Sequence, residues 1–426
     1  MAARLRPYQT AGADWLAGKT TALLADQMRL GKSAQAITAA HRLWPANQHG
    51  LFIGVVCPAS VVPVWHEQFK SWWPGQQPNL HVASYDKVAR GAFDAFAFDV
   101  LILDEAHYLK NKDAVRTKKI LGDRCDRVGG LVWRAGAVWC LTGTPTPNHP
   151  AELWPVLRAL APETIQKGGA PMNYWSFVST YCKTKDNGFG QQITGGKNLD
   201  RLRTAIEPFV LRRRYEDVAG DMPAMQYDTL PVNGMAPDEG ELAKLLKDCT
   251  SDEEILSRLK AKGSHVASLR RLTGLAKVKG VVDWLRDWFD GDGGKIVLFA
   301  HHKDVIQGLV DGAAGIVGEV ARIDGSMPQH ERALAVKHFR ERETCKVFVG
   351  QIQAAGTGID LSSSNCLIFV ESDWVPGNNE QAAMRIQKVG KAEMNQVFMA
   401  TLPGSVDEQI QRACLRKVRD SLEIFG

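Results

Sequence analysis

The sequence predicts an α/β protein with two tandem lobes, each a parallel sheet flanked by helices. Short apolar runs that end in polar residues alternate with helical stretches through most of the 426 residues, as in parallel sheets covered by helices on both faces. The alternation stops near Pro223, Pro231 and Pro237 and then starts again. Because prolines interrupt both helices and sheet interiors, this stretch indicates a boundary. We therefore expect a first lobe at 1–222 and a second lobe at 223–426.

The composition is typical of a soluble globular protein. Hydrophobic residues make up 45% of the chain, enough to fill two cores, and the formal net charge is +5, which permits a nucleic-acid partner without requiring one. No apolar run reaches the ~18 residues of a membrane span, and the first residues lack the apolar segment of a signal peptide. We expect a monomer without membrane contact, located in the cytoplasm or nucleoid of a prokaryotic or viral-host cell, or in the nucleus of a eukaryote. The eight cysteines follow no metal-ligand spacing and indicate reduced core residues.

The buried strand predicted at 100–103 ends in two adjacent carboxylates, Asp104 and Glu105. Ligands of parallel α/β sheets bind beyond the carboxyl ends of the strands. Two neighbouring acids there suit a divalent cation and the activation of a water that attacks a phosphate. We assign Mg²⁺ to Asp104 and the role of base to Glu105. For an Asp-Glu pair alone, two solvated acids at a strand end would be the simpler interpretation.

A second motif upstream favours the interpretation of these acids as part of a phosphate site. Gly31, Lys32 and Ser33 open a predicted helix after a short apolar strand, an arrangement that places backbone N–H groups, a lysine and a hydroxyl around a polyphosphate. Lys32 would neutralise the β- and γ-phosphates, and Ser33 would share Mg²⁺ with Asp104. Gly-Lys-Ser alone is weak evidence, and the later strand ending in two acids makes it strong. Arg29 stands where many such loops have glycine, so a bulky side chain must fit where the backbone often needs freedom.

The other elements of the first lobe follow in chain order. Gln9 begins a helical stretch, and its amide suits the N6 and N7 edge of adenine. We expect further strands at 51–57, 82–84 and 138–141, and an aromatic helix at 61–73. A small helical insertion is expected at about 150–222, with a hairpin or loop rich in glycine and glutamine at 187–196.

The second lobe repeats the alternation of strands and helices. Its strand candidates lie at 295–300, 346–349, 367–370 and 396–401, and a terminal helix is expected at about 405–424. This lobe has no Gly-Lys-Ser/Thr motif of its own. We therefore expect it to complete the nucleotide site of the first lobe.

In this order, the pieces resemble the Swi/Snf-type ATPases of helicase superfamily 2 almost from end to end. The matching motifs of the first lobe lie at 5–9, 26–33, 56–65, 104–111, 141–148, 152–154 and 208–213. The last of these, Pro208-Phe-Val-Leu-Arg-Arg213, is rare in other branches of the superfamily. In the second lobe the matches lie at 322–339, 354–361, 372–374 and 381–390. The sequence segment at 272–277, together with the segments at 322–326 and 374–377, favours the annealing-helicase and fork-remodelling branch of this family.

The resemblance implies a DNA-stimulated ATPase with two RecA-like lobes and a nucleotide cleft between them. Such enzymes translocate on double-stranded DNA and remodel protein–DNA complexes or DNA forks. The implied cofactors are ATP and Mg²⁺. The implied partner is double-stranded DNA, held by its phosphates and therefore largely without regard to sequence, with a DNA-bound protein as a further substrate.

The resemblance also assigns residues by motif position. Nucleotide contacts fall on Arg6, Gln9, Leu30, Gly31, Lys32, Ser33, Gly358, Gln381 and Arg385. DNA contacts fall on Ser60, Trp65, Ser84, Tyr85, Thr144, Gly325, Gly356 and Trp374, and packing in the core is an equal alternative for the aromatic ones. Arg385 and Lys388 take the place of the catalytic arginine fingers, with a lysine where the second arginine usually stands. Their spacing of three residues predicts one shared helix face.

The residues leave two other functions open. One is a strand-separating helicase acting on DNA or RNA, because Asp-Glu-Ala-His also occurs in RNA helicases; the phrases at 142–145 and 211–213 argue against it. The other is an ATP-gated DNA clamp with weak hydrolysis, because Arg29 and Lys388 depart from the family pattern.

Overall fold

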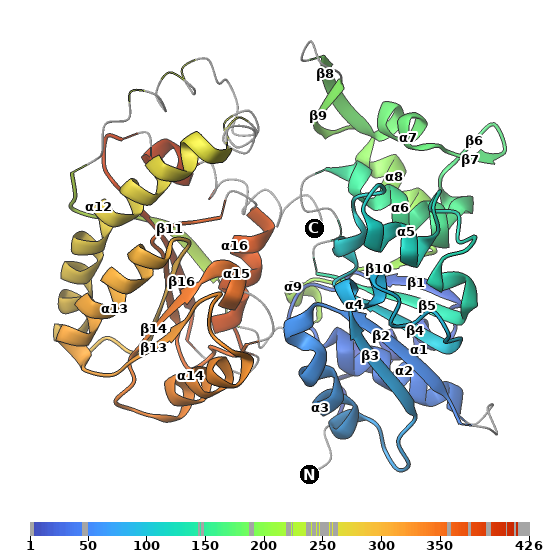
Figure 1. Cartoon of the computed structure of the whole chain (residues 1–426), viewed down its shortest axis with the longest axis horizontal. Coiled ribbons are helices and arrows are strands. Elements are labelled where there is room, and N and C mark those ends of the chain that lie inside the picture. The colour runs from blue at the N-terminus through green and yellow to red at the C-terminus, as the bar shows by residue number, and fades with distance from the viewer. Residues whose placement is uncertain are drawn as a thin grey trace. The chain divides into compact units, whose positions relative to one another are not determined.

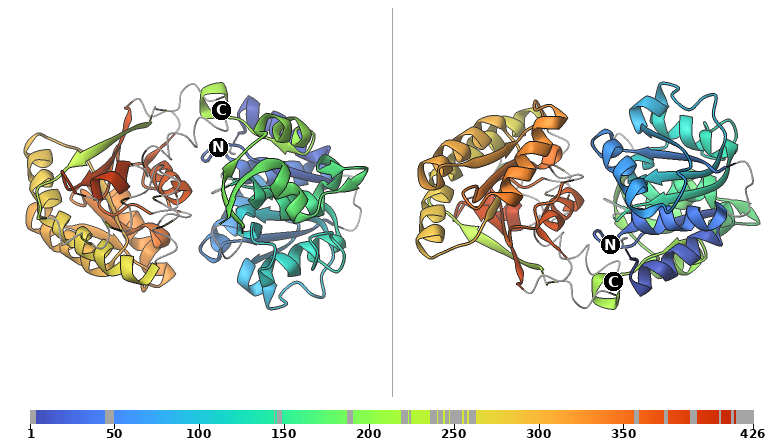
Figure 2. Two further views of the ribbon diagram at one scale, coloured as in Figure 1. Left: turned by 90° about the horizontal axis from the view of Figure 1, so that it is seen from above. Right: turned by 90° about the horizontal axis from the view of Figure 1, so that it is seen from below.

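The computed structural model describes residues 4–44, 50–143, 145, 149–186, 191–218, 223, 225–235, 240, 244, 247, 255, 258, 263–355, 359–373, 376–388, 393–405, 407–412 and 415. The chain divides into two compact units, Met1–Val218 and Ala219–Gly426. Each unit contains a six-stranded sheet with helices on both faces (Figures 1 and 2). The expected α/β class, with two parallel sheets flanked by helices, is therefore confirmed.

The sheet of unit 1 has the order β10-β1-β5-β4-β2-β3, and every neighbouring pair is parallel. Its strands are β1 (Thr21–Leu24), β2 (Phe52–Cys57), β3 (Asn79–Ser84), β4 (Phe98–Asp104), β5 (Ala135–Leu141) and β10 (Val210–Leu211). All but β10 are confirmed expectations. A strand of two residues carries no periodic signal, so only its pairing with β1 identifies β10.

Alternate residues of the central strand β4 fill two different cores. Val100 and Ile102 pack on one face of the sheet, and Leu101 and Leu103 pack on the other. This follows from the two-residue period of a strand, and it explains why β4 is a continuous apolar run.

Helices α1 (Pro7–Ala17), α2 (Lys32–Leu43) and α3 (Val62–Trp72) contribute to the first of these cores. The second core takes residues from α4 (Tyr85–Ala89), α5 (Val115–Leu121), α6 (Trp154–Leu160), α7 (Tyr174–Tyr181) and α8 (Leu199–Ile206). A short helix α9 (Tyr215–Val218) ends the unit. Single 3₁₀ turns connect several of these elements: η2 (Ala59–Val61), η3 (Ala106–Leu109), η4 (Leu131–Arg134), η5 (Pro150–Leu153) and η6 (Pro162–Thr164).

The insertion of unit 1 carries two small antiparallel pairs. Strands β8 (Cys182–Asp186) and β9 (Gln191–Gly196) form a hairpin, and β6 (Gln166–Lys167) pairs with β7 (Ala170–Pro171). The hairpin expected from the glycines and glutamines is confirmed and begins earlier than expected, while its tip lies outside the described residues.

The sheet of unit 2 has the order β11-β16-β15-β12-β14-β13, again with parallel neighbours. Its strands are β11 (Met225–Pro231), β12 (Ile296–Ala300), β13 (Val320–Ile323), β14 (Val347–Gln351), β15 (Cys366–Phe369) and β16 (Asn395–Thr401). The four expected strands are confirmed. Strands β11 and β13, which lie at the two edges of the sheet, were not expected from the sequence. Because edge strands tolerate polar residues, their apolar pattern is weak.

Two cores also cover the faces of the second sheet. One includes residues of α12 (Gly263–Asp290) and α13 (Lys303–Val317), and the other includes residues of α14 (Gln329–Glu341), α15 (Ile352–Ala355) and α16 (Pro376–Ala383). Residues 407–412 and 415 are helical. Within the helix expected at about 405–424, residue 405 lies in a bend, and the remaining positions lie outside the described residues.

Among the described residues, no helix combines the length and apolarity needed to cross a membrane. The described cysteines are free and buried: Cys57, Cys125, Cys140, Cys182, Cys345 and Cys366. Burial raises the pKa of the Cys140 and Cys366 thiols to about 12, which makes them unreactive near neutral pH.

Candidate nucleotide site

Strand register brings the phosphate loop (residues 26–33) and the two acids to one edge of the sheet in unit 1. Leu24, the last residue of β1, pairs with Leu141 of β5, and Leu141 pairs with Asp104 of β4 on its other side. Neighbouring strands lie roughly 4.8 Å apart. The loop after β1 and the carboxylates after β4 are therefore separated by one intervening strand, at the edge where ligands of such sheets bind.

The phosphate loop has the left-handed backbone that its shape requires. Gly31 is the N-cap of α2 with φ 74°, and a Cβ atom at this position would lie 2.4 Å from Nε2 of Gln9. Arg29 has φ 68°. A non-glycine residue in this region is uncommon and costs roughly 1–3 kcal/mol. The expectation that the loop must accommodate a bulky side chain in an unfavourable backbone region is confirmed.

Lys32 lies in the first turn of α2 and turns its amine back onto the loop. Nζ donates to the main-chain oxygens of Asp26, at 2.8 Å, and Gln27, at 3.3 Å. Burial lowers the pKa of Lys32, and the carboxylates of Glu105, Asp26 and Asp104 oppose that shift. The lysine therefore belongs to the same electrostatic neighbourhood as the two acids at the end of β4.

Three hydrogen bonds hold Asp104 in place. Oδ1 accepts from the main-chain N–H of Glu105 at 3.0 Å, and Oδ2 accepts from Nε1 of Trp65 at 2.8 Å. The hydroxyl of Tyr85 donates to the main-chain oxygen of Asp104 at 2.8 Å. Burial and the neighbouring Glu105 raise the pKa of Asp104 to about 7, although the bond from Trp65 and the charge of Lys32 pull it down. A nearby positive charge would therefore shift this carboxyl towards its ionised form.

Glu105 occupies a strained backbone position beside Asp104. Its φ of 51° and ψ of 52° are left-handed, which is uncommon outside glycine and recurs at functional sites. Oε2 lies 3.3 Å from Nδ1 of His107, and that nitrogen also lies 3.1 Å from the hydroxyl of Thr142. The second acid is thus linked through His107 to the loop that follows β5.

The segment expected to read adenine is tied to the phosphate loop. The main-chain N–H of Arg6 donates to Oε1 of Gln9 at 2.9 Å, and Nε2 of Gln9 donates to the main-chain oxygen of Leu30 at 3.2 Å. An amide oxygen has a second lone pair and an amide nitrogen a second hydrogen. Gln9 can therefore keep both contacts and still bond to a base.

The structure corrects three of the expected DNA contacts. Trp65 is 1% exposed, Tyr85 2% and Ser84 6%. Trp65 and Tyr85 point their polar atoms at Asp104, and Ser84 caps α4 by accepting from the N–H of Lys87 at 3.3 Å. These side chains are therefore not available for direct DNA contact in this structure. Trp65 and Tyr85 pack in the core, which was the alternative expected for the aromatic residues, and bond to Asp104, while Ser84 caps α4.

The remaining expected DNA contacts are divided between the two units. Ser60 is half-buried in η2, and Gly325 is exposed in unit 2, where its N–H donates to Oε1 of Gln351 at 2.8 Å. Thr144, Gly356 and Trp374 lie outside the described residues, as does Gly358 of the expected nucleotide contacts.

The finger candidates of unit 2 do not share a helix. Gln381 lies in α16, and Arg385 is half-buried in the turn η7 (Met384–Ile386). The turn ends there, because Gln387 is extended, 2% exposed and bonded through Nε2 to the main-chain oxygen of Pro223 at 3.0 Å. Lys388 follows in an exposed position. The expectation that Arg385 and Lys388 occupy one helix face is therefore wrong.

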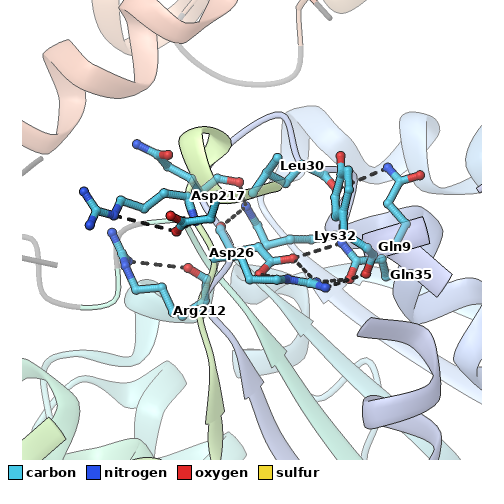
Figure 3. A network of polar contacts seen from close by, with 12 residues as sticks. Gln9, Asp26, Leu30, Lys32, Gln35, Arg212 and Asp217 are labelled. Carbon is cyan, nitrogen blue, oxygen red and sulfur yellow. Dashed lines mark hydrogen bonds and ion pairs between the residues drawn. The ribbon is translucent and has the colours of Figure 1, made fainter. Parts of the chain in front are cut away.

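Sequence reasoning did not identify a buried ion pair beside the phosphate loop. Asp26 and Arg213 approach to 2.5 Å, although 187 positions separate them in the chain. Figure 3 shows Asp26 among Lys32, Gln35 and Gln9. Both partners belong to motifs of the resemblance, but no spacing rule connects residues so far apart. Only the pairing of β10 with β1 brings them together.

A glycine-lysine-serine loop at the start of α2, two acids at the end of β4 and a second parallel α/β unit define a nucleotide-binding P-loop ATPase. Comparison with known families agrees. The SNF2-related domain matches residues 8–93 and 87–242, and the helicase conserved C-terminal domain matches residues 277–390. The chain belongs to the SNF2-related family of helicase-like ATPases.

The chain is similar to parts of longer known proteins. The chain is 28% identical over 446 residues to SWI/SNF-related matrix-associated actin-dependent regulator of chromatin subfamily A-like protein 1 of Xenopus tropicalis, covering 98% of this chain and 45% of that protein. It is 26% identical over 443 residues to DNA annealing helicase and endonuclease ZRANB3 of Homo sapiens, covering 95% of this chain and 39% of that protein. The chain thus spans less than half the length of these two relatives.

Among solved structures, the chain is similar to the SWI2/SNF2 ATPase core of Sulfolobus solfataricus in complex with double-stranded DNA. The identity is 21% and the TM-score 0.43, with 100% of this chain and 95% of that chain covered.

Proposed function

We propose that the chain is a DNA-stimulated ATPase that translocates on double-stranded DNA and remodels protein–DNA complexes or DNA forks. The observation that carries the proposal is the register that sets Lys32 and the pair Asp104 and Glu105 at one sheet edge. The names of two relatives, an annealing helicase and a chromatin regulator, support DNA as the partner.

ATP binding requires a change at Lys32. The first N–H groups of α2 and the Lys32 amine would hold the β- and γ-phosphates. The amine now donates to the main-chain oxygens of Asp26 and Gln27. These bonds would weaken or break as the amine turns to a phosphate, while Gln9 would bind the base and keep its contact with Leu30.

The residues at the end of β4 fit a hard divalent cation. Asp104 is a buried carboxyl whose pKa of about 7 reflects burial and a neighbouring carboxylate, and a cation would favour its ionised form. Asp104 and the hydroxyl of Ser33 are oxygen ligands of the kind that Mg²⁺ prefers. When bound, Mg²⁺ would neutralise charge on the phosphates.

Glu105 is the proposed general base. Its left-handed backbone turns it away from the line of β4, and its carboxylate lies near His107. In this proposal it accepts a proton from the water that attacks the γ-phosphate. The contact from His107 to Thr142 links that carboxylate to the loop after β5, which belongs to the motif of the resemblance at 141–148.

The roles proposed for Arg385 and for the DNA contacts rest on their motif positions in the sequence. Arg385 would stabilise charge on the phosphates during hydrolysis, with Lys388 in a lesser role. Ser60 and Gly325 would hold DNA phosphates, in line with their accessibility. Binding through phosphates makes affinity steeply dependent on salt.

Steady-state ATP hydrolysis with duplex DNA, single-stranded DNA, RNA or no nucleic acid tests this function. We expect the largest stimulation with duplex DNA and little with RNA. Stronger stimulation by RNA would instead identify a strand-separating RNA helicase, and tight duplex binding with no stimulated hydrolysis would identify an ATP-gated clamp. Duplex affinity should also fall by about 10²-fold between low and moderate salt if several phosphates are held.

A further inference from the structure

Arg213 makes a set of contacts that the proposed chemistry does not use. Its Nε donates to Oδ1 of Asp26 at 3.0 Å, and Nη2 donates to Oδ2 of Asp26 at 2.5 Å and to Oε1 of Gln35 at 2.7 Å. Nη1 donates to the main-chain oxygen of Tyr8. Gln35 closes the network by donating from Nε2 to Oδ2 of Asp26 at 3.0 Å and to the main-chain oxygen of Leu30 at 3.0 Å.

This network is buried. Asp26 and Gln35 are 0% exposed, and the Arg213 side chain is 14% exposed. A Cβ atom on Gly12 of α1 would lie 1.9 Å from Oε1 of Gln35 and 2.5 Å from Nη2 of Arg213, so α1 closes over both groups. Removal of one partner from a buried ion pair leaves an uncompensated charge, which costs far more than the pair itself contributes.

The two polar groups of Asp26 serve different partners. Its main-chain oxygen accepts from the Lys32 amine at 2.8 Å, while its carboxylate is held by Arg213 and Gln35. Figure 3 shows the side chains of Asp26, Lys32 and Gln35 in one cluster. The only carboxylate among the residues of the phosphate loop therefore lies close to the loop lysine without forming an ion pair with it.

We propose that Arg213 is a positioning residue for the phosphate loop, which holds the carboxylate of Asp26 away from Lys32 so that the lysine amine can turn to a phosphate. The inference rests on the proposed ATP-binding function. Without Arg213, Asp26 would be a buried carboxylate with the Lys32 amine as a nearby cation. An ion pair between them would compete with the nucleotide for the same amine, because a carboxylate and a phosphate oxygen are alternative partners of an ammonium group.

The test is the affinity of the full chain for a fluorescent ATP analogue. Arg213→Met should weaken binding by about tenfold or more, since a hydrogen-bonded charge pair with Lys32 would have to break. Asp26→Asn combined with Arg213→Met should recover most of that loss, because no carboxylate then competes for the lysine. In hydrolysis, the loss should appear mainly as a raised KM with kcat largely kept.

A purely structural role gives the opposite pattern. The double variant would then bind no better than Arg213→Met, because it removes more of the network. Arg203→Met is the matched control, since Arg203 on α8 is 61% exposed with its cation 3.9 Å from Asp200, and it should bind like the parent. Circular dichroism and a thermal melt establish that each variant is folded.

Arg213→Lys tests the positioning role of Arg213 if the methionine variant does not fold. A lysine keeps the charge but lacks the planar fork that reaches Asp26 and Gln35 together, so affinity should fall, and adding Asp26→Asn should restore it. Parental affinity in folded Arg213→Met, or in Arg213→Lys where only that variant folds, overturns the inference.

Lys32→Ala separates this inference from the proposed function. If Lys32→Ala binds the analogue like the parent, the phosphate-loop assignment fails and the proposed function fails with it. If Lys32→Ala binds weakly while the Arg213 variants bind normally, only the positioning role of Arg213 fails.

Discussion

Trp65 on α3 donates its indole N–H to Oδ2 of Asp104 at the end of β4, over 2.8 Å. The sequence left DNA contact and core packing as equal alternatives for Trp65, and the side chain is 1% exposed and bonded to the first acid of the motif. The bond fixes the direction of a carboxylate that has little other freedom, because Oδ1 already accepts from the N–H of Glu105.

Trp65→Phe should therefore impair ATP hydrolysis beyond its effect on folding. Loss of a hydrogen bond to a charged group, worth about 1.5–3 kcal/mol, should lower kcat/KM for ATP by roughly tenfold or more. The matched control is Trp73→Phe, because Trp73 is 3% exposed and donates to the main-chain oxygen of Gln76 at 2.8 Å, away from the acids. Both variants should melt at similarly lowered temperatures, and an equal loss of activity in both would contradict the role of Trp65.

Glu105→Gln should keep ATP affinity and lose turnover. The amide preserves the shape of the side chain but cannot accept a proton, and a general base contributes about 10²- to 10⁴-fold in rate. Binding of a fluorescent ATP analogue and single-turnover hydrolysis with saturating duplex DNA measure the two effects separately. ATP turnover at the parental rate in this variant would show that Glu105 is not the general base.

Arg385→Ala should abolish most DNA-stimulated hydrolysis while ATP and DNA still bind. An arginine that stabilises transferring phosphate contributes about 10³- to 10⁵-fold. Lys388→Ala should lose much less, because Lys388 is exposed beyond the turn that holds Arg385. Hydrolysis by Arg385→Ala at the parental rate would show that unit 2 does not supply this group.

Glu371 of unit 2 gives a prediction for pH. Burial would raise the pKa of its carboxyl, but hydrogen bonds from the His302 ring, at 2.6 Å, and from the main-chain N–H groups of His302 and His301, at 2.9 and 2.8 Å, hold the pKa below its usual 4.5. A carboxyl whose folded pKa is depressed stabilises the fold above its unfolded pKa, and that stabilisation is lost as the pH falls through the folded value.

Glu371→Gln should therefore lower the urea midpoint of unfolding at pH 7, by an amount equivalent to about 1–3 kcal/mol. The difference from the parent should narrow as the pH falls below about 4.5, where the carboxyl of the unfolded parent becomes protonated. Glu331→Gln on the surface of α14 is the control and should match the parent throughout. A difference that stays constant with pH would mean that charge is not what Glu371 contributes.

The central strands were predictable from the sequence alone. Residues 100–103 form a continuous apolar run because β4 is buried on both faces, and the acids after it mark its carboxyl end. The phosphate loop was predictable for a similar reason, since its residues are contiguous and each contributes through local backbone geometry. Edge strands such as β13 gave no clear pattern, because one side of an edge is not enclosed.

The sequence by itself determined the α/β class, the candidate phosphate loop at residues 26–33 and the candidate acids Asp104 and Glu105, since each depends on residues close together in the chain. Tertiary structure alone decided the partners of those residues. Trp65 joins Asp104 and Arg213 joins Asp26 because parallel strands, linked by long crossovers, bring distant segments to one sheet edge. The same holds for Gln387, which follows the turn that holds Arg385 and bonds to the main-chain oxygen of Pro223. Hydrogen bonds between distant residues leave no periodic trace in a sequence, so only the folded sheet shows which side chains they fix.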